Sequence, residues 1–426
     1  MIWGILIAMA LMMLCSMRGI SIVVVAPVCA ILAAITGGGD LLKAYTTTYM
    51  TGVGNYVAEY FPIFLMGAVL GELMKNSGAA ASLAHFVMKK LGVKHAILAC
   101  MLATIVMVYG GVSTFCVIFA LYPFMFFCFK EADIPLRMMP GVLFGGIIVT
   151  QATLPGCLQI QNIIPCTMLG VDLQAAPIMG TTSFIIMTVG AVLYLNWETK
   201  RQRAKGYHFE DERNEAKTLN VEEDLPNVVF SVLPIVVVIV LLNVCKFPAV
   251  GALFGGIVLS VVLFFKRLKA NMLPTFNTAC KNSMPAILNT ACAVGFGSVI
   301  QTLTGFNGLV KGLESLAGGN PFVFAFIAVN VLAGVTGSAS GGTRIALDAV
   351  GKQLLATGAN PAALARVCAV SSCGLDSLPH NGAVITIINY CGQTHKKSYL
   401  PIFVVSVVLP IIGGLWCVLL ANLGIM

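Results

Sequence analysis

Charged residues are scarce in this chain. They make up 10% of its 426 residues, whereas 58% are hydrophobic. This balance excludes an ordinary soluble domain, in which about a quarter of the residues carry a charge. The long apolar runs instead predict an all-α polytopic membrane protein whose surroundings are the lipid bilayer. The net charge of +8 does not indicate nucleic-acid binding, because the basic residues flank apolar runs, as membrane topology requires.

The chain also lacks paired cysteine motifs. Its fourteen cysteines stand singly in apolar runs, and no CxxC motif occurs. This pattern favours buried free thiols over a disulfide framework or a structural metal site. The first apolar run, residues 3–17, has neither a basic start nor a small-residue cleavage site. We therefore expect a membrane helix there rather than a secretory signal peptide.

Only one long polar stretch occurs, at residues 197–226. We predict that it is a cytoplasmic linker between two halves, residues 1–196 and 227–426. The halves repeat: Pro155 and Pro379 both follow a leucine, and Pro177 and Pro401 follow those prolines at the same interval. Repeated halves with breaks at matching positions are typical of transporters.

Two stretches, 95–129 and 321–357, have apolar arms on either side of a glycine-rich centre. An arm of about 15 residues rises only about 22 Å, which is short of a hydrocarbon core of about 30 Å. We predict two re-entrant hairpins with their tips near the membrane midplane. Two full helices joined by a short loop are the alternative.

Each half is predicted to contain five membrane helices and one hairpin. Five crossings are an odd number, so the second half must enter the membrane inverted. Residues 39–58 and 268–284 are expected to be interfacial helices. The membrane helices are predicted at residues 3–17, 19–36, 60–75, 137–172 (broken), 175–196, 227–244, 247–266, 285–303, 361–391 (broken) and 400–424.

Most lysines and arginines fall on one side of this arrangement, which we predict to be cytoplasmic. Both termini then face the outside of the inner (cell) membrane.

Ionisable and polar groups gather at the hairpin tips and at the breaks, and such groups within a membrane mark a functional site. Helix N-termini there would attract an anion, while carbonyls and hydroxyls could hold a cation. Asp376, with Ser338 and Thr386, is the candidate for the coupling ion. The breaks are placed at Gly110, Gly111, Pro155, Gly156, Gly341, Gly342 and Pro379. The candidates for substrate binding are Ser113, Thr114, Gln159, Gln161, Asn162, Ser338, Ser340, Thr343, Arg344, His380 and Asn381.

Several of these residues have structural alternatives. Arg344 could clamp a carboxylate or form an ion pair with Asp348, four residues further along the helix. His380 could be a structural hydrogen-bonder or a proton carrier. Asp376 could bind the coupling ion or neutralise a buried cation. The small residues at the tips could simply allow close helix packing.

The segments LPGCLQIQNIIP, GSASGGTRIAL and GLDSLPHNGAVITIINYCGQTHKKSY resemble the gluconate permease family of the ion transporter superfamily, in particular its hydroxybutyrate-permease branch. The resemblance implies secondary transport of a small organic anion, such as 3-hydroxybutyrate or gluconate, coupled to H⁺ or Na⁺. It implies a dimerising scaffold domain and an elevator-type transport domain, each drawn from both halves. It also implies that the tips and breaks hold the substrate carboxylate. Thr343 and Arg344 depart from the apolar or glycine pair expected there.

The leading prediction is therefore a symporter that is not an enzyme and needs no cofactor beyond its coupling ion. An uncoupled organic-anion exchanger or channel is the alternative. A remote alternative is an intramembrane hydrolase with a tip serine as nucleophile and His380 as base. The sequence speaks against that hydrolase, because Ala339 stands where a nucleophile elbow needs serine.

Overall fold

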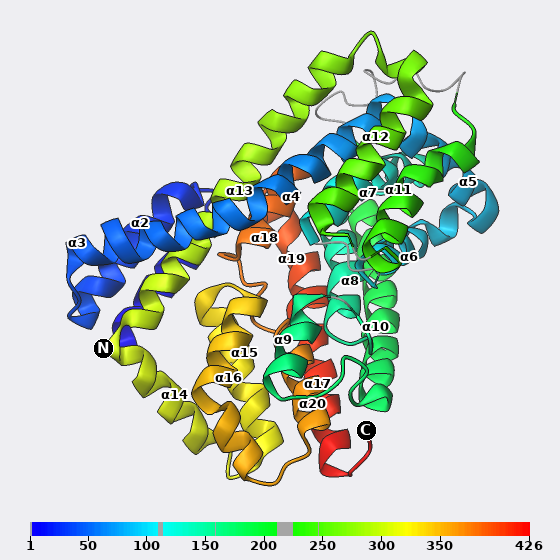
Figure 1. Cartoon of the computed structure of the whole chain (residues 1–426). Helices are drawn as coiled ribbons and strands as arrows, with labels where there is room; N and C mark the ends of the chain where they lie inside the picture. Colours follow the sequence, from blue (N-terminus) through cyan, green and yellow to red (C-terminus); the bar gives the residue numbers. More distant parts are fainter. Residues whose placement is uncertain (1, 110–113, 158, 211–224, 246) are drawn as a thin grey trace.

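The computed structural model describes residues 2–109, 114–157, 159–210, 225–245 and 247–426, and all regular structure in these residues is helical (Figure 1). Five helices of this part are long and apolar enough to cross a membrane. The all-helical, polytopic class predicted from the sequence is confirmed. The predicted tip residues Gly110, Gly111 and Ser113 lie outside the described residues.

The first half begins with two apolar helices and ends with a long helix that leads into the linker. Its elements are α1 (Ile2–Met17), α2 (Ile22–Gly37), α3 (Leu41–Lys43), η1 (Ala44–Tyr49), α4 (Met50–Asn76), α5 (Ala79–Leu91), η2 (Val93–His95), α6 (Ala96–Tyr109), α7 (Thr114–Glu131), η3 (Leu136–Met138), α8 (Met139–Gln151), α9 (Ile160–Met168) and α10 (Pro177–Ala204).

The second half has a similar order of elements. They are α11 (Val228–Asn243), α12 (Ala249–Leu268), α13 (Met272–Thr302), α14 (Thr304–Leu316), α15 (Pro321–Thr336), α16 (Ala339–Ala356), α17 (Pro361–Ser371), α18 (Gly382–Tyr390), α19 (His395–Phe403), η4 (Val404–Val408) and α20 (Leu409–Asn422).

The two predicted interfacial helices were wrong as separate elements. Residues 41–76 form one continuous helix, and so do residues 272–302. Pro62 and Pro285 lie inside these helices without ending them. The prediction failed because the polar first turns look interfacial, although the same helix continues into an apolar segment. The sequence also gave no sign of α5 and α14, because neither contains a long apolar run.

The long helices α4 and α13 pack against each other and cross (Figure 1). Helix α13 also contacts α2 and α18, while α4 contacts α7 and α12. The hairpin arms α15 and α16 pack together and against α17 and α9 respectively. The two broken segments and the second hairpin therefore lie beside one another, next to the α4–α13 pair.

Close packing holds the second hairpin together. A Cβ atom at Gly342 would lie 2.3 Å from Cα of Ala333 in the opposite arm, which is too close for any side chain. Small residues at such positions let helix backbones approach each other in a membrane, where van der Waals packing drives association. Gly342 of α16 thus lets the arms come into contact.

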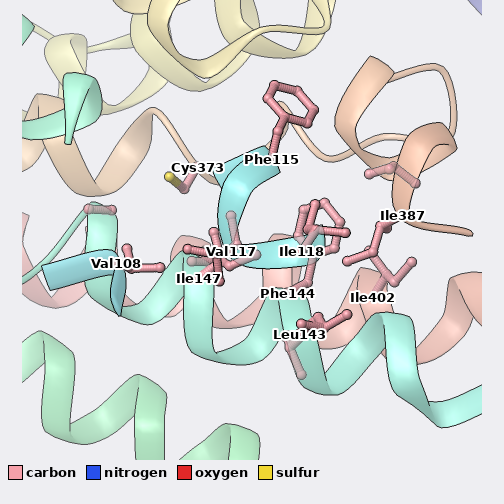
Figure 2. Close-up of a cluster of buried hydrophobic side chains, with 14 of the residues drawn as sticks. Val108, Phe115, Val117, Ile118, Leu143, Phe144, Ile147, Cys373, Ile387 and Ile402 are labelled. Carbon is pink, nitrogen blue, oxygen red and sulfur yellow. The ribbon is translucent and has the colours of Figure 1, made fainter. Parts of the chain in front are cut away.

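An apolar cluster joins the first hairpin to its neighbours. Figure 2 shows Val117 and Ile118 of α7 beside Phe144 and Ile147 of α8, close to Ile387 of α18. Each of these five residues is at most 3% exposed. The cluster fixes the position of α7 relative to the two broken segments.

Candidate functional site

A cavity of about 140 Å³ lies where the second hairpin and the two breaks meet α4 and α13. Its walls combine apolar side chains with hydroxyl, amide and carboxyl groups. The polar side chains that line it belong to Tyr56, Tyr60, Thr114, Gln151, Gln159, Gln161, Thr290, Ser338, Ser340, Asp376 and Asn381. We call it the central pocket. It brings together most of the predicted candidates that the structure describes.

Four helices begin at the central pocket. The first residues of α7, α9, α16 and α18 are Thr114, Ile160, Ala339 and Gly382, and all four line the cavity. The first backbone N–H groups of a helix have no partner within the helix, and the helix dipole places partial positive charge there. Four such starts around one cavity make an environment that favours an anion.

The second tip is built by helix ends. Gly337 ends α15 in the left-handed region, with φ of 63°. Ser338 then caps α16 by accepting a hydrogen bond from the N–H of Gly341 at 3.2 Å. The predicted break at Gly341 and Gly342 was therefore wrong: both lie in the first turn of α16, and Gly342 allows the close packing of the hairpin arms.

The second break clamps this tip. The Nε2 atom of His380 lies 3.0 Å from the carbonyl oxygen of Gly334, and Nδ2 of Asn381 donates to that of Gly337 at 2.9 Å. Asn381 also caps α18 by accepting from the N–H of Val384. Asn381 lines the central pocket, whereas His380 is buried outside its lining. His380 therefore makes a structural hydrogen bond. Its Nδ1 atom has no partner among the described residues, and a role as proton carrier stays a prediction.

Asp376 is 7% exposed and lines the central pocket. Its Oδ1 accepts a hydrogen bond from the hydroxyl of Ser377 at 2.9 Å. Among the described residues, no lysine or arginine forms an ion pair with it. A buried carboxylate of this kind can bind a proton or a small cation.

The first break contributes amides. Gln159 donates from Nε2 to the carbonyl of Val108 at 2.9 Å, which ties the break to the end of α6. Asn162 is fully buried and lies outside the pocket lining. Gln161 lines the cavity, and its Oε1 has no hydrogen-bond partner among the described residues. Gln161 is the amide of this break that is positioned for a ligand.

Pro155 and Gly156 lie between α8 and α9, and Pro379 precedes α18, as predicted.

Three further candidates lie off the central pocket. The Thr343 hydroxyl donates to the carbonyl of Ala339 within α16. Thr386 forms a hydroxyl–hydroxyl hydrogen bond with Thr290 at 3.2 Å. Arg344 is exposed on α16, and it forms no ion pair with Asp348, which the structure also describes.

Sequence reasoning missed four polar residues of the pocket. Gln151 accepts a hydrogen bond from the Thr114 hydroxyl at 3.3 Å, and its lone amide in an apolar helix could have been recognised. Tyr56, Tyr60 and Thr290 come from α4 and α13. Nothing in their local sequence indicates that those helices face the tips.

A polytopic helical protein with a polar pocket between broken helices is a membrane transport protein by class. Residues 1–252 match the GntP family of permeases. The chain is 34% identical, over 95% of its length and 95% of the relative's, to "Uncharacterized transporter YxjC" of Bacillus subtilis (strain 168). It is 28% identical over 224 residues, 50% of this chain and 44% of the relative, to "Uncharacterized permease" of Haemophilus influenzae.

The chain belongs to the GntP permease family. It is a multi-pass membrane transporter and not an enzyme, which removes the hydrolase alternative.

Proposed function

We propose that this permease is a secondary active symporter of a small organic acid anion, of the 3-hydroxybutyrate or gluconate class, coupled to H⁺ or Na⁺. The observation that carries the proposal is the convergence of four helix starts on the central pocket. The substrate carboxylate would accept hydrogen bonds from backbone N–H groups and from the hydroxyls of Ser338, Ser340 and Thr114. The hydroxyls of the substrate would meet Gln161, Asn381 and Gln151.

Asp376 is the proposed site of coupling. It lies in the same cavity as the helix starts, so a cation on its carboxylate would offset the charge of a neighbouring anion. Binding of one would strengthen binding of the other, which is the linkage that symport requires.

The proposed transport cycle is an elevator motion of a homodimer in the inner membrane. The two halves would be inverted repeats, with both termini outside and the linker in the cytoplasm. The pair α4–α13 would belong to the scaffold, and the hairpins with the broken segments to the transport domain. In support, the central pocket lies at the boundary between these two groups of helices.

Cysteines at Tyr207 and Asn320 should be labelled from opposite sides of the membrane; labelling from one side would contradict the inverted arrangement.

Uptake by the purified protein in liposomes tests the function. Labelled 3-hydroxybutyrate and gluconate would be offered under a proton gradient, a sodium gradient or neither. Symport predicts accumulation of one acid above the outside concentration under one gradient only. Equilibration without accumulation under every condition would instead establish an uncoupled exchanger or channel.

A further inference from the structure

A second cavity, of about 340 Å³, lies between α4, α7, α13 and α18. We call it the lysine pocket. Unlike the central pocket, it has two basic side chains in its wall. Its lining residues are Glu72, Lys75, Tyr122, Thr278, Lys281, Asn282, Pro285, Asn289, Thr386, Asn389 and Tyr390.

The two cavities follow each other along one seam. On α13, residues 278–289 line the lysine pocket, and Thr290 and Val294 line the central pocket. On α18, residues 386–390 line the lysine pocket, and residues 382–383 line the central one. The same succession occurs along α4 and α7. A molecule that left the central pocket along this boundary would therefore enter the lysine pocket.

A thin barrier separates the cavities. The hydroxyls of Thr290 and Thr386 are hydrogen-bonded at 3.2 Å, one residue lining each cavity. On the same helices, the ring of Phe64 in α4 lies 4.0 Å from that of Phe115 in α7, and the ring of Phe119 in α7 lies 4.7 Å from that of Tyr390 in α18, centroid to centroid. These contacts join α4, α7, α13 and α18 along the seam.

The charge of the lysine pocket suits a small carboxylate. Lys75 and Lys281 bring two positive charges against the single negative charge of Glu72. Part of the Glu72 carboxylate is already engaged, because Oε1 accepts from Nδ2 of Asn282 at 3.1 Å. The residues that line the pocket therefore carry one positive charge in excess, which matches the single carboxylate of a small organic acid. The surrounding amides and hydroxyls provide donors and acceptors for the hydroxyl groups of the same molecule.

We propose that the lysine pocket is a second binding site for the transported hydroxy-carboxylate, in which the ammonium groups of Lys75 and Lys281 hold the carboxylate. The site is separate from the central pocket and in series with it. This inference rests on the proposed function, because it takes the transported acid as the ligand.

Equilibrium dialysis of the purified protein with the radiolabelled acid that it transports tests the proposal. The parent protein should bind two acids per protomer. The double variant Lys75→Gln/Lys281→Gln should bind one, because the central pocket is intact. The matched control Lys269→Gln/Lys396→Gln removes the same charge from two exposed side chains outside both cavities and should still bind two. One acid per protomer in the parent protein would overturn the second site.

Labelling gives an independent result that does not depend on the lysine variants. Thr278→Cys would be introduced after replacing the exposed Cys245 and Cys280 by serine. At ten times the dissociation constant of the second site, the acid should slow thiol labelling about tenfold, because about nine-tenths of the sites are occupied. Labelling of Lys269→Cys should not change. An unprotected Thr278→Cys in a protein that still transports would refute the second site, whereas loss of all uptake and binding would refute the proposed function instead.

Discussion

Arg366 of α17 donates a hydrogen bond to Oδ1 of Asn162 in α9 at 3.0 Å, which joins the two halves of the chain inside the protein. Arg366 is 1% exposed, and its guanidinium also donates to the carbonyl of Ala175 at 2.9 Å. Asn162 in turn donates to the carbonyls of Cys157 and Leu173. Arg366 and Asn162 thus fix the first break against the second broken segment.

Replacement of Arg366 by methionine should destabilise the protein. The change keeps much of the side-chain volume but leaves Oδ1 of Asn162 and the carbonyl of Ala175 without this donor, so the free energy of unfolding should fall by about 3 kcal/mol. Thermal unfolding in detergent measures the loss. The matched control Arg344→Met, on an exposed arginine, should change the stability by less than about 0.5 kcal/mol. Equal stabilities would show that Arg366 does not hold the break.

Asp376→Asn should uncouple transport. The amide has nearly the shape of the carboxyl group, but it neither titrates nor carries a charge for a cation. Gradient-driven accumulation should therefore disappear, while exchange of labelled for unlabelled acid across the liposome membrane continues. Accumulation that persists under the gradient would place the coupling site elsewhere.

Gly382 marks a close contact of α18 with α13. A Cβ atom there would lie 2.5 Å from Cα of Thr290. Gly382→Ala should displace the start of α18 from the central pocket and lower the uptake rate at least about tenfold, because small misplacements of binding groups are costly. Gly351→Ala is the control, since its Cβ would meet only ordinary contacts at 3.7 Å or more. If both variants transport alike, the close contact has no role in transport.

Asp133, in the loop after α7, holds the start of the linker. Its carboxylate pairs with His208 at 2.8 Å and accepts from the N–H of Phe209 at 3.0 Å. These contacts lower the pKa of the Asp133 carboxyl below its usual value near 4. Because the pKa is lowered, the stabilisation that the ionised Asp133 carboxylate gives to the folded linker start is complete at neutral pH. It is lost only as the pH falls through the lowered pKa.

The measurement for this contact is hydrogen exchange of the Phe209 amide, corrected for its intrinsic pH dependence. Asp133→Asn tolerates the left-handed backbone at this position, φ of 51°, and removes only the charge. Protection should not fall between pH 8 and pH 5 in the parent protein, and it should be several-fold lower in the variant. Protection that already falls between pH 7 and pH 5 would assign the contact to a different titrating group.

The sequence was sufficient for the apolar helices, the second hairpin and both breaks, whereas the tip of the first hairpin lies outside the described residues. Their signals are local: length and apolar character for the helices, and glycine or proline within apolar runs for the breaks. The turn of the second tip was misplaced by a few residues, because Gly337 and the pair Gly341–Gly342 look alike in sequence. Only the structure separates Gly337, which turns the chain, from Gly342, which allows close packing of the arms.

The partners of the site residues could not be predicted. Arg366 stands in an apolar helix with no nearby acid, and its acceptors come from the other half of the chain. Tyr56, Tyr60 and Thr290 reach the central pocket only because α4 and α13 are single long helices that pack against the transport elements. Such contacts arise from packing over long sequence separations, for which a single sequence carries no periodic signal.

The most direct test of the account is whether the transported acid protects the start of α16. Ser340→Cys would be placed in the background with serine at Cys245 and Cys280, and its labelling rate would be measured with and without the acid. Thr357→Cys, at the exposed far end of the same helix, serves as the control. We predict that saturating acid slows labelling at Ser340→Cys about tenfold and leaves the control unchanged. Equal rates at Ser340→Cys, in a variant that still transports the acid, would contradict an anion site at the converging helix starts.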